Sequence, residues 1–294
     1  MGYILRVILC AASLLLLGTN LKYNTFLSNI WVIIVISVLS SLLPLKIMLL
    51  VILAYIVVQT ATLSLGVGLL MAGIMLVMYF LYLRYADAYG YVLILMPLMF
   101  IIKIPLVVPL VLAVIAPGSA VISLAFGIIM YYFIHYININ SAVISGMPAD
   151  VAEFTKAGMV FRGVFSYREF LYTLCIMVLV FMLVFFLKKL NINQSFALAV
   201  VAGTGFYLVL MIIATMVFGG ITSGKLISLI VSSLISLIIA VFIVNIVLPL
   251  DYSRTEFLEF EDEEYYYFVR AVPKANIAKE TVRIKRINTR KEGR

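Results

Sequence analysis

Long apolar runs, separated by short polar loops, fill the chain as far as residue 250, and a polar segment follows. A helix that crosses the bilayer needs about 20 apolar residues to span about 30 Å of hydrocarbon, and most of these runs approach that length. The pattern therefore predicts membrane-spanning helices. The apolar blocks are Tyr3–Gly18, Asn29–Leu43, Lys46–Leu65, Val67–Leu83, Gly90–Ala116, Ser119–Ile137, Phe170–Leu187, Phe196–Phe218 and Leu226–Leu250.

Two alternatives stay open between Ile30 and Leu83, where the apolar sequence is almost continuous. This stretch could form two long tilted helices or three shorter ones. Pro44 and the glycines Gly66 and Gly68 are residues that interrupt helices, and they favour three.

Composition excludes a water-soluble fold. Of the 294 residues, 65% are apolar and 12% are charged, and the mean hydropathy is +1.21. Soluble domains are roughly 45–50% apolar and 25% charged. The first 250 residues hold 15 charged side chains, whereas the last 44 hold 19. The chain therefore divides into a transmembrane helical domain, residues 1–250, and a polar tail, residues 251–294.

The block Gly90–Ala116 differs from the others because Pro97, Pro105 and Pro109 interrupt it, with Lys103 near its middle. Each proline removes a backbone donor and clashes with the preceding turn. The two halves have 12–13 residues each, about 20 Å at 1.5 Å per residue, which is too short to cross alone. The block is either one broken span or a re-entrant hairpin, residues 90–116, that enters and leaves on one side.

Charge asymmetry favours the hairpin, because Lys and Arg in short loops lie preferentially in the cytoplasm. The basic tail and Lys188-Lys189 should lie inside. With a hairpin, Arg6, Lys46 and Arg84 lie inside too, whereas a crossing would move all three outside. We therefore expect an all-α polytopic membrane protein with about eight transmembrane helices, one broken, re-entrant helical hairpin and both termini in the cytoplasm.

The longest polar linker in the domain predicts an interfacial amphipathic helix over residues 148–167. Pro148 can open a helix at its first position. One apolar stripe then follows at alternating spacings of three and four, formed by Val151, Phe154, Gly158, Phe161 and Phe165. A helix that lies flat in the outer headgroup layer fits this pattern. The alternative is a lid over a cavity at the hairpin.

Lys103 and Pro105 are the first candidates for a substrate pathway. Non-helical backbone at membrane depth survives only where protein buries it or where it lines a wet cavity, and an ionisable residue within a span suggests function. The alternative for Lys103 is an anchor whose amine reaches the headgroups. Further candidates are Gln59, Thr60 and Thr204, for which helix packing and hydrogen bonds between helices are the competing explanation.

The sequence offers little for catalysis. Residues 219–225 fit the phosphate-loop spacing, but Leu226 replaces the required Ser or Thr and no strand precedes the motif. The single histidine, His135, has no carboxylate within any apolar block as a partner. We therefore expect no enzyme activity, no catalytic residues, no metal site and no cofactor.

The tail predicts a β-hairpin with Thr255–Glu261 and Glu264–Val272 as its strands. A lone hairpin is marginally stable in water, so a cytoplasmic protein partner could bind it. Partner-binding candidates are Tyr265, Tyr266, Tyr267 and Arg270. The basic residues of 270–294 should contact anionic lipid headgroups of the inner leaflet. We expect no nucleic acid as a partner.

Several segments together carry a resemblance to a known family. They are residues 85–90, Pro97 with Lys103-Ile104-Pro105, and residues 251–256, 264–267 and 271–274 of the tail. With these segments the chain resembles an uncharacterised family of polytopic membrane proteins from Gram-positive anaerobes, sometimes loosely labelled transporter permeases. The resemblance covers most of the chain and implies a bacterial plasma membrane protein, but it implies no activity or site residues.

Two functions remain open at this point. The first is a permease-like component for transport or for lipid or solute flipping, with its site at the broken helix, because transporters build sites from discontinuous helices. The second is a non-catalytic membrane scaffold for envelope or division machinery, whose tail recruits partners.

Overall fold

The computed structural model describes residues 3–83, 89–148, 152–190, 195–218, 223–247, 256–261 and 266–271. Helices account for this structure apart from two short strands and the connecting turns. Within these residues five helices are long and apolar enough to cross a membrane, so the fold is helical, as expected, and consistent with a multi-pass membrane protein. They are Leu45–Leu63, Gly118–Ile139, Arg168–Leu187, Ser195–Phe218 and Ser223–Val247.

The N-terminal part consists of α1 (Tyr3–Asn20), α2 (Ile30–Ser41), α3 (Leu45–Leu63) and α4 (Leu65–Met78), which continues as the π-helical turn Tyr79–Leu83. The apolar stretch from Ile30 thus forms three helices, as expected. Pro44 precedes α3, and the second break is at Ser64. However, α2 has 12 residues and extends about 18 Å, less than the hydrocarbon thickness.

The proline-rich block is broken in the middle. It forms α5 (Val92–Ile101) and α6 (Val107–Ile115), and neither half is long enough to cross alone. Pro97 lies inside α5 without ending it, so the break falls at Lys103 and Pro105 only. After a short 3-10 turn, Gly118–Ala120, the chain continues as α7 (Val121–Ile139), against which α5 packs.

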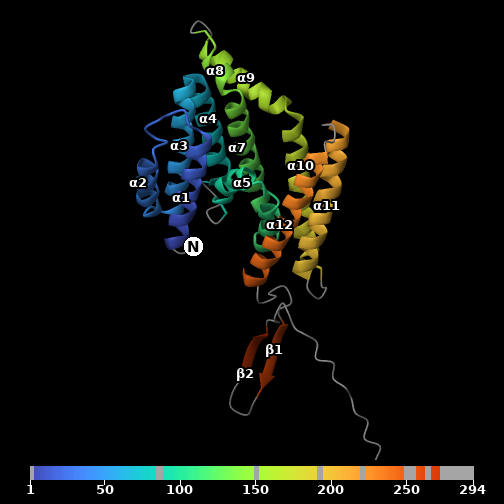
Figure 1. Cartoon of the computed structure of the whole chain (residues 1–294). Coiled ribbons are helices and arrows are strands. Elements are labelled where there is room, and N and C mark those ends of the chain that lie inside the picture. Colours follow the sequence, from blue (N-terminus) through green and yellow to red (C-terminus); the bar gives the residue numbers. More distant parts are fainter. Residues whose placement is uncertain are drawn as a thin grey trace, which may run out of the picture.

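The C-terminal part of the domain consists of α8 (Ser141–Ser145), α9 (Glu153–Ser166), α10 (Arg168–Leu187), α11 (Ser195–Phe218) and α12 (Ser223–Val247). Figure 1 shows α9 lying across one end of the bundle, while α10, α11 and α12 run along it. The amphipathic helix is therefore present, but it begins at Glu153 rather than at Pro148, which lies outside any helix.

The tail contains the expected hairpin. Strands β1 (Glu256–Glu261) and β2 (Tyr266–Ala271) pair antiparallel (Figure 1), with Glu261 opposite Tyr266 and Glu256 opposite Ala271. The two strands therefore pair along their full length.

Candidate functional site

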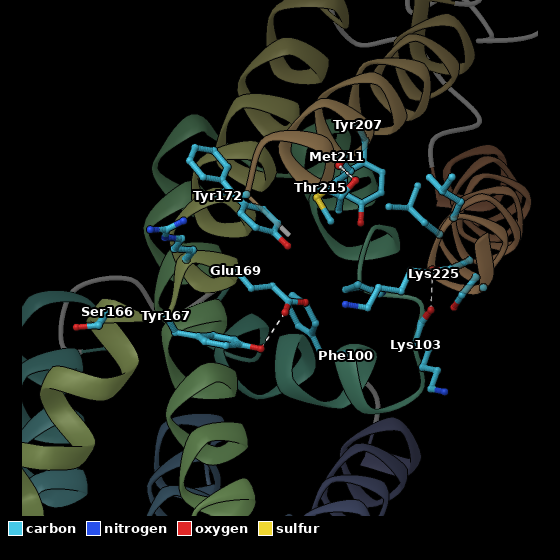
Figure 2. Close-up of a pocket in the computed structure, with 18 residues that line it drawn as sticks. Phe100, Lys103, Ser166, Tyr167, Glu169, Tyr172, Tyr207, Met211, Thr215 and Lys225 are labelled. Carbon is cyan, nitrogen blue, oxygen red and sulfur yellow. Dashed lines mark hydrogen bonds between the residues drawn. The ribbon is translucent and has the colours of Figure 1, made fainter. Parts of the chain in front are cut away.

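A cavity of about 820 Å³ reaches from one end of the bundle to the break between α5 and α6. Its walls come from the N-terminal parts of α10 and α12, the C-terminal half of α11, and the broken segment (Figure 2). We call it the α12 cavity, and its charged lining residues are Lys103, Arg168, Glu169 and Lys225.

The floor of the cavity is a helix end of the Schellman type. The Lys103 N–H donates to Phe100 O (3.1 Å) and the Ile104 N–H donates to Met99 O (2.9 Å), the two bonds that define this motif. Lys103 takes the left-handed conformation at its centre, with a φ of 68°. Pro105 then prevents the helix from continuing. The break is therefore a defined turn within the bundle.

Helix α12 is attached to this turn. The Ser232 hydroxyl donates to Lys103 O at 2.7 Å, which satisfies a carbonyl that the broken helix leaves free. The Lys103 side chain is exposed at the cavity edge, and Figure 2 shows it pointing away from Glu169. Lys103 therefore contributes its backbone to the floor, while its ammonium group points away from Glu169 at the mouth (Figure 2).

The other charges lie at the mouth. Glu169 accepts a hydrogen bond from the Tyr167 hydroxyl at 2.9 Å, and Figure 2 shows the Lys225 side chain extending into the cavity toward Glu169. Burial, together with the Glu169 carboxylate, raises the pKa of Tyr167 to about 12, so this hydroxyl stays protonated and keeps donating. Glu169 is thus held in place on one side of the mouth.

Two helix N-termini add positive potential at the same place. Helix α10 begins at Arg168 and α12 begins at Ser223, and residues of both first turns line the cavity. The N-terminus of a helix carries about half a positive charge and free N–H donors. Arg168 and Lys225 strengthen this potential, and Glu169 offsets part of it. The mouth therefore favours an anionic group.

Of the predicted pathway residues, the structure brings Lys103 and Pro105 to the cavity and places Gln59, Thr60 and Thr204 outside it. The buried Gln59 side chain accepts from the Asn24 N–H (2.9 Å) and donates to the Ser28 and Tyr55 hydroxyls (3.0 Å each). Gln59 therefore holds the α1–α2 loop.

The two threonines are also buried and bond to their own helices. Thr60 donates to Ile56 O and Thr204 donates to Val200 O, both at 2.9 Å. Beside Thr204, a Cβ added to Gly203 would overlap the Val184 side chain, so α10 and α11 approach closely there. Both segments serve helix packing.

Sequence reasoning missed Glu169, Arg168 and Lys225. A signal was present, because the expected topology places Lys225 and the linker that ends at Glu169 on the same side of the membrane. What the sequence could not show is that α10 and α12 begin beside one cavity.

The apolar stripe of α9 faces away from this cavity. Phe154, Gly158, Phe161 and Phe165 line a second recess together with α4 and α7, and only the end of α9 at Ser166 reaches the α12 cavity. The interpretation of α9 as a lid over the hairpin therefore does not describe this structure. Val151, the first residue of the predicted stripe, lies outside the described residues.

In the tail, Tyr266 and Tyr267 lie on β2 and are exposed. Arg270 also belongs to β2. Tyr265 and residues 272–294, to which the lipid contact was assigned, lie outside the described residues.

No group of three or more His, Cys, Asp or Glu side chains that could hold a metal ion occurs in the part of the chain that the structure describes. The α12 cavity instead offers ammonium, guanidinium and hydroxyl donors beside one carboxylate. Comparison with known proteins adds no constraint, since no family model, no curated protein and no solved structure matches the chain.

Proposed function

We propose that this chain is a permease-like protein of the bacterial plasma membrane that binds the anionic headgroup of a lipid or an anionic solute in the α12 cavity and moves it past the α5–α6 break. The observation that carries this proposal is one cavity with cationic groups and helix N-termini at its mouth and a broken helix at its floor.

Charge supports an anion as the substrate. The cavity is lined by three cations, Lys103, Arg168 and Lys225, and by one carboxylate, Glu169. Hydrogen bonds from charged donors to phosphate or carboxylate are roughly twice as strong as neutral ones. The Ser228 hydroxyl of α12, which also lines the cavity, can supply a neutral donor.

Depth supports movement across the membrane. The floor is attached at Ser232, nine residues along α12 from Ser223, which corresponds to about 14 Å. This is close to half of the hydrocarbon thickness of about 30 Å. The cavity thus reaches about half-way across the membrane. In the other half, α6 packs against α10 and α12 and blocks passage of the substrate.

The closed half is stabilised at its far end. The Lys188 ammonium donates to Val114 O (3.1 Å) and Ala116 O (2.9 Å), and so caps the C-terminus of α6. In the topology that we propose, with eight crossings and both termini inside, Lys188 lies at the cytoplasmic side and the α12 cavity opens outward. Release inward would require α6 to separate from α10.

A binding experiment tests this proposal. Dioctanoyl phosphatidylglycerol, an anionic probe, and dioctanoyl phosphatidylcholine, a zwitterionic one, are titrated calorimetrically into the purified full chain in detergent. The anionic probe should bind more tightly. Lys225→Gln should weaken its binding about tenfold, the equivalent of about 1.4 kcal/mol. Lys22→Gln removes an exposed charge elsewhere and serves as the matched control.

Equal binding of both probes, unchanged in Lys225→Gln, would contradict the anion site. Inorganic phosphate as a competitor separates a headgroup site from a solute site. Transfer is then measured in proteoliposomes as the rate at which fluorescent phosphatidylglycerol becomes accessible to an external quencher.

The scaffold remains a second candidate because of the hairpin. Tyr266 and Phe268 of β2 are 72% and 77% exposed, and both edges of a two-stranded sheet are open to a further strand. Deletion of residues 255–294 separates the candidates. If the chain is a permease, the truncated protein still binds the anionic probe in the α12 cavity. If it is a scaffold, the truncated protein no longer supports its cellular function.

A further inference from the structure

The second recess lies beneath α9 and is separate from the α12 cavity. It has a volume of about 760 Å³. We call it the α9 groove, and it is bordered by residues 66–78 of α4, 126–133 of α7 and 153–165 of α9. Its lining consists of aliphatic and aromatic side chains and glycines, apart from Glu153 at one end.

The Glu153 carboxylate is not available to a ligand. It accepts hydrogen bonds from the Ser64 hydroxyl (2.5 Å), the Gly66 N–H (2.7 Å) and the Lys156 ammonium (2.9 Å). These bonds attach the start of α9 to the start of α4. The groove therefore presents hydrocarbon to whatever enters it.

The dimensions of the groove match one leaflet. Its wall on α4 runs from Gly66 to Met78, about 18 Å at 1.5 Å per residue, slightly more than half of the hydrocarbon thickness. It begins beneath α9, the amphipathic helix at the end of the bundle (Figure 1). The groove therefore extends from the expected headgroup layer toward the middle of the membrane.

The recess is open where side chains are missing. A Cβ added to Gly73 or to Gly158 would meet no atom within 4 Å, so these glycines leave space in the walls. Three phenylalanines of α9 border this space with exposed rings, and Phe154 is the most exposed at 87%, followed by Phe161 and Phe165. Exposed apolar patches of this kind mark membrane or partner contacts, and in a bilayer the surrounding hydrocarbon is the material that fills them.

We propose that the α9 groove holds one acyl chain of a membrane phospholipid, with the headgroup at the level of α9. An acyl chain gains no hydrophobic free energy by moving from lipid hydrocarbon into an apolar groove. The complex is therefore stabilised by van der Waals packing between the acyl chain and the side chains of the groove. This proposal does not depend on the substrate of the α12 cavity.

Tryptophan fluorescence tests the proposal. The chain has one tryptophan, Trp31, so the variant Trp31→Phe with Phe161→Trp reports from the groove alone. The full chain in detergent is titrated with a phospholipid that carries bromine atoms, which quench tryptophan, on one acyl chain. Quenching should saturate with a single lipid bound per chain. The unbrominated phospholipid should restore the fluorescence by competition.

Variants that fill the groove should abolish the saturable quenching. Gly73→Leu and Gly158→Leu each place a side chain in the open space. Gly205→Leu is the matched control, because Gly205 of α11 also has no neighbour within 4 Å and lies outside the groove. If one filling variant fails to fold, the other variant and the competition experiment still decide.

Two results would overturn the proposal. Quenching that rises without saturation, equally in filled and unfilled variants, would mean that the indole introduced at position 161 senses only the surrounding lipid. Alternatively, a second copy occupies the groove if Gly73→Leu converts a dimer into a monomer and the brominated lipid does not quench.

Discussion

At position 103 a lysine adopts the backbone conformation that helices usually give to glycine at their C-terminal end. The left-handed conformation costs an L-residue roughly 1–2 kcal/mol. Glycine would form the same turn more easily, so the conformation alone does not explain a lysine here. The ammonium group of Lys103 is the feature that glycine lacks, and Lys103 belongs to the lining of the α12 cavity.

Two substitutions at this position separate conformation from charge. Lys103→Gly and Lys103→Ala both remove the ammonium group, and both should weaken binding of dioctanoyl phosphatidylglycerol to a similar extent. Their stabilities should differ, because only glycine relieves the strained φ. We expect Lys103→Gly to be about 1 kcal/mol more stable than Lys103→Ala, measured by denaturant unfolding in mixed micelles. Equal stabilities would contradict the left-handed turn.

Gln59 illustrates a polar residue at depth that has a structural purpose. Gln59→Leu would remove the acceptor of the Asn24 N–H and the amide donor to the Ser28 and Tyr55 hydroxyls, of which Tyr55 keeps its bond to Leu27 O. Buried polar groups left unpaired cost about 1–3 kcal/mol each. We expect a loss of at least about 2 kcal/mol in unfolding free energy with no change in anion binding. Thr60→Val, one residue away, should lose much less, because Thr60 bonds only to its own helix. Weakened anion binding in Gln59→Leu would contradict this structural role and would indicate that Gln59 contributes to the substrate pathway.

At the scale of elements, the attachment of α9 to α4 is the most specific contact outside the spans. A carboxylate is favourable at a helix N-terminus. Here the Glu153 carboxylate of α9 lies at the N-terminus of α4. A Cβ on Gly66 would overlap the Glu153 carbonyl, so α9 approaches α4 at a position where only glycine fits. This contact keeps the roof of the α9 groove in place.

The attachment should depend on pH. Hydrogen bonds from Ser64, Lys156 and Gly66 lower the pKa of Glu153 from 4.5 to about 2. A group whose pKa is lower in the folded state stabilises the fold above its unfolded pKa, and that contribution disappears as the pH falls through the folded value. The melting temperature of the parent should exceed that of Glu153→Gln above pH 4.5, and the difference should shrink toward pH 2. A constant difference across this range would contradict the lowered pKa.

At the scale of the whole molecule, the topology that we propose assigns opposite sides of the membrane to the two ends of the bundle. Lys22 follows α1, and the neighbouring Tyr23 hydroxyl donates to the Asn138 side chain at 3.4 Å. The C-termini of α1 and α7 therefore lie at the same end of the bundle. Lys189 follows α10, where Lys188 caps α6. The two ends are therefore well separated along the bundle.

Cysteine labelling tests this arrangement in cells. In a chain with Cys10→Ser and Cys175→Ala, Lys22→Cys should react with a membrane-impermeant maleimide from outside. Lys189→Cys should react only after the membrane is permeabilised. Labelling of both from the same side would contradict the proposed topology. The opposite pattern would invert it, and the α12 cavity would then open to the cytoplasm.

Much of the fold could be predicted because the signals are local. Apolar runs indicate spans wherever the solvent is lipid, the prolines of block 90–116 indicate a break, and the run of strand-forming residues around Tyr266 indicates a strand. Each of these depends on residues that are close in sequence. The predicted start of α9 was wrong by five residues, because Pro148 permits a helix start but does not require one.

The candidate site depended on tertiary structure. The sequence by itself determined that long apolar helices build the chain, that one segment is broken near Lys103 and that the tail forms a hairpin, since local backbone preferences and hydrophobicity decide these. Only the tertiary structure decided that Glu169 and Lys225 share a cavity with that break, that Gln59 holds a loop and that α9 roofs an apolar groove. The physical reason is that contacts between distant helices depend on how their surfaces pack, and packing leaves no periodic pattern in the sequence.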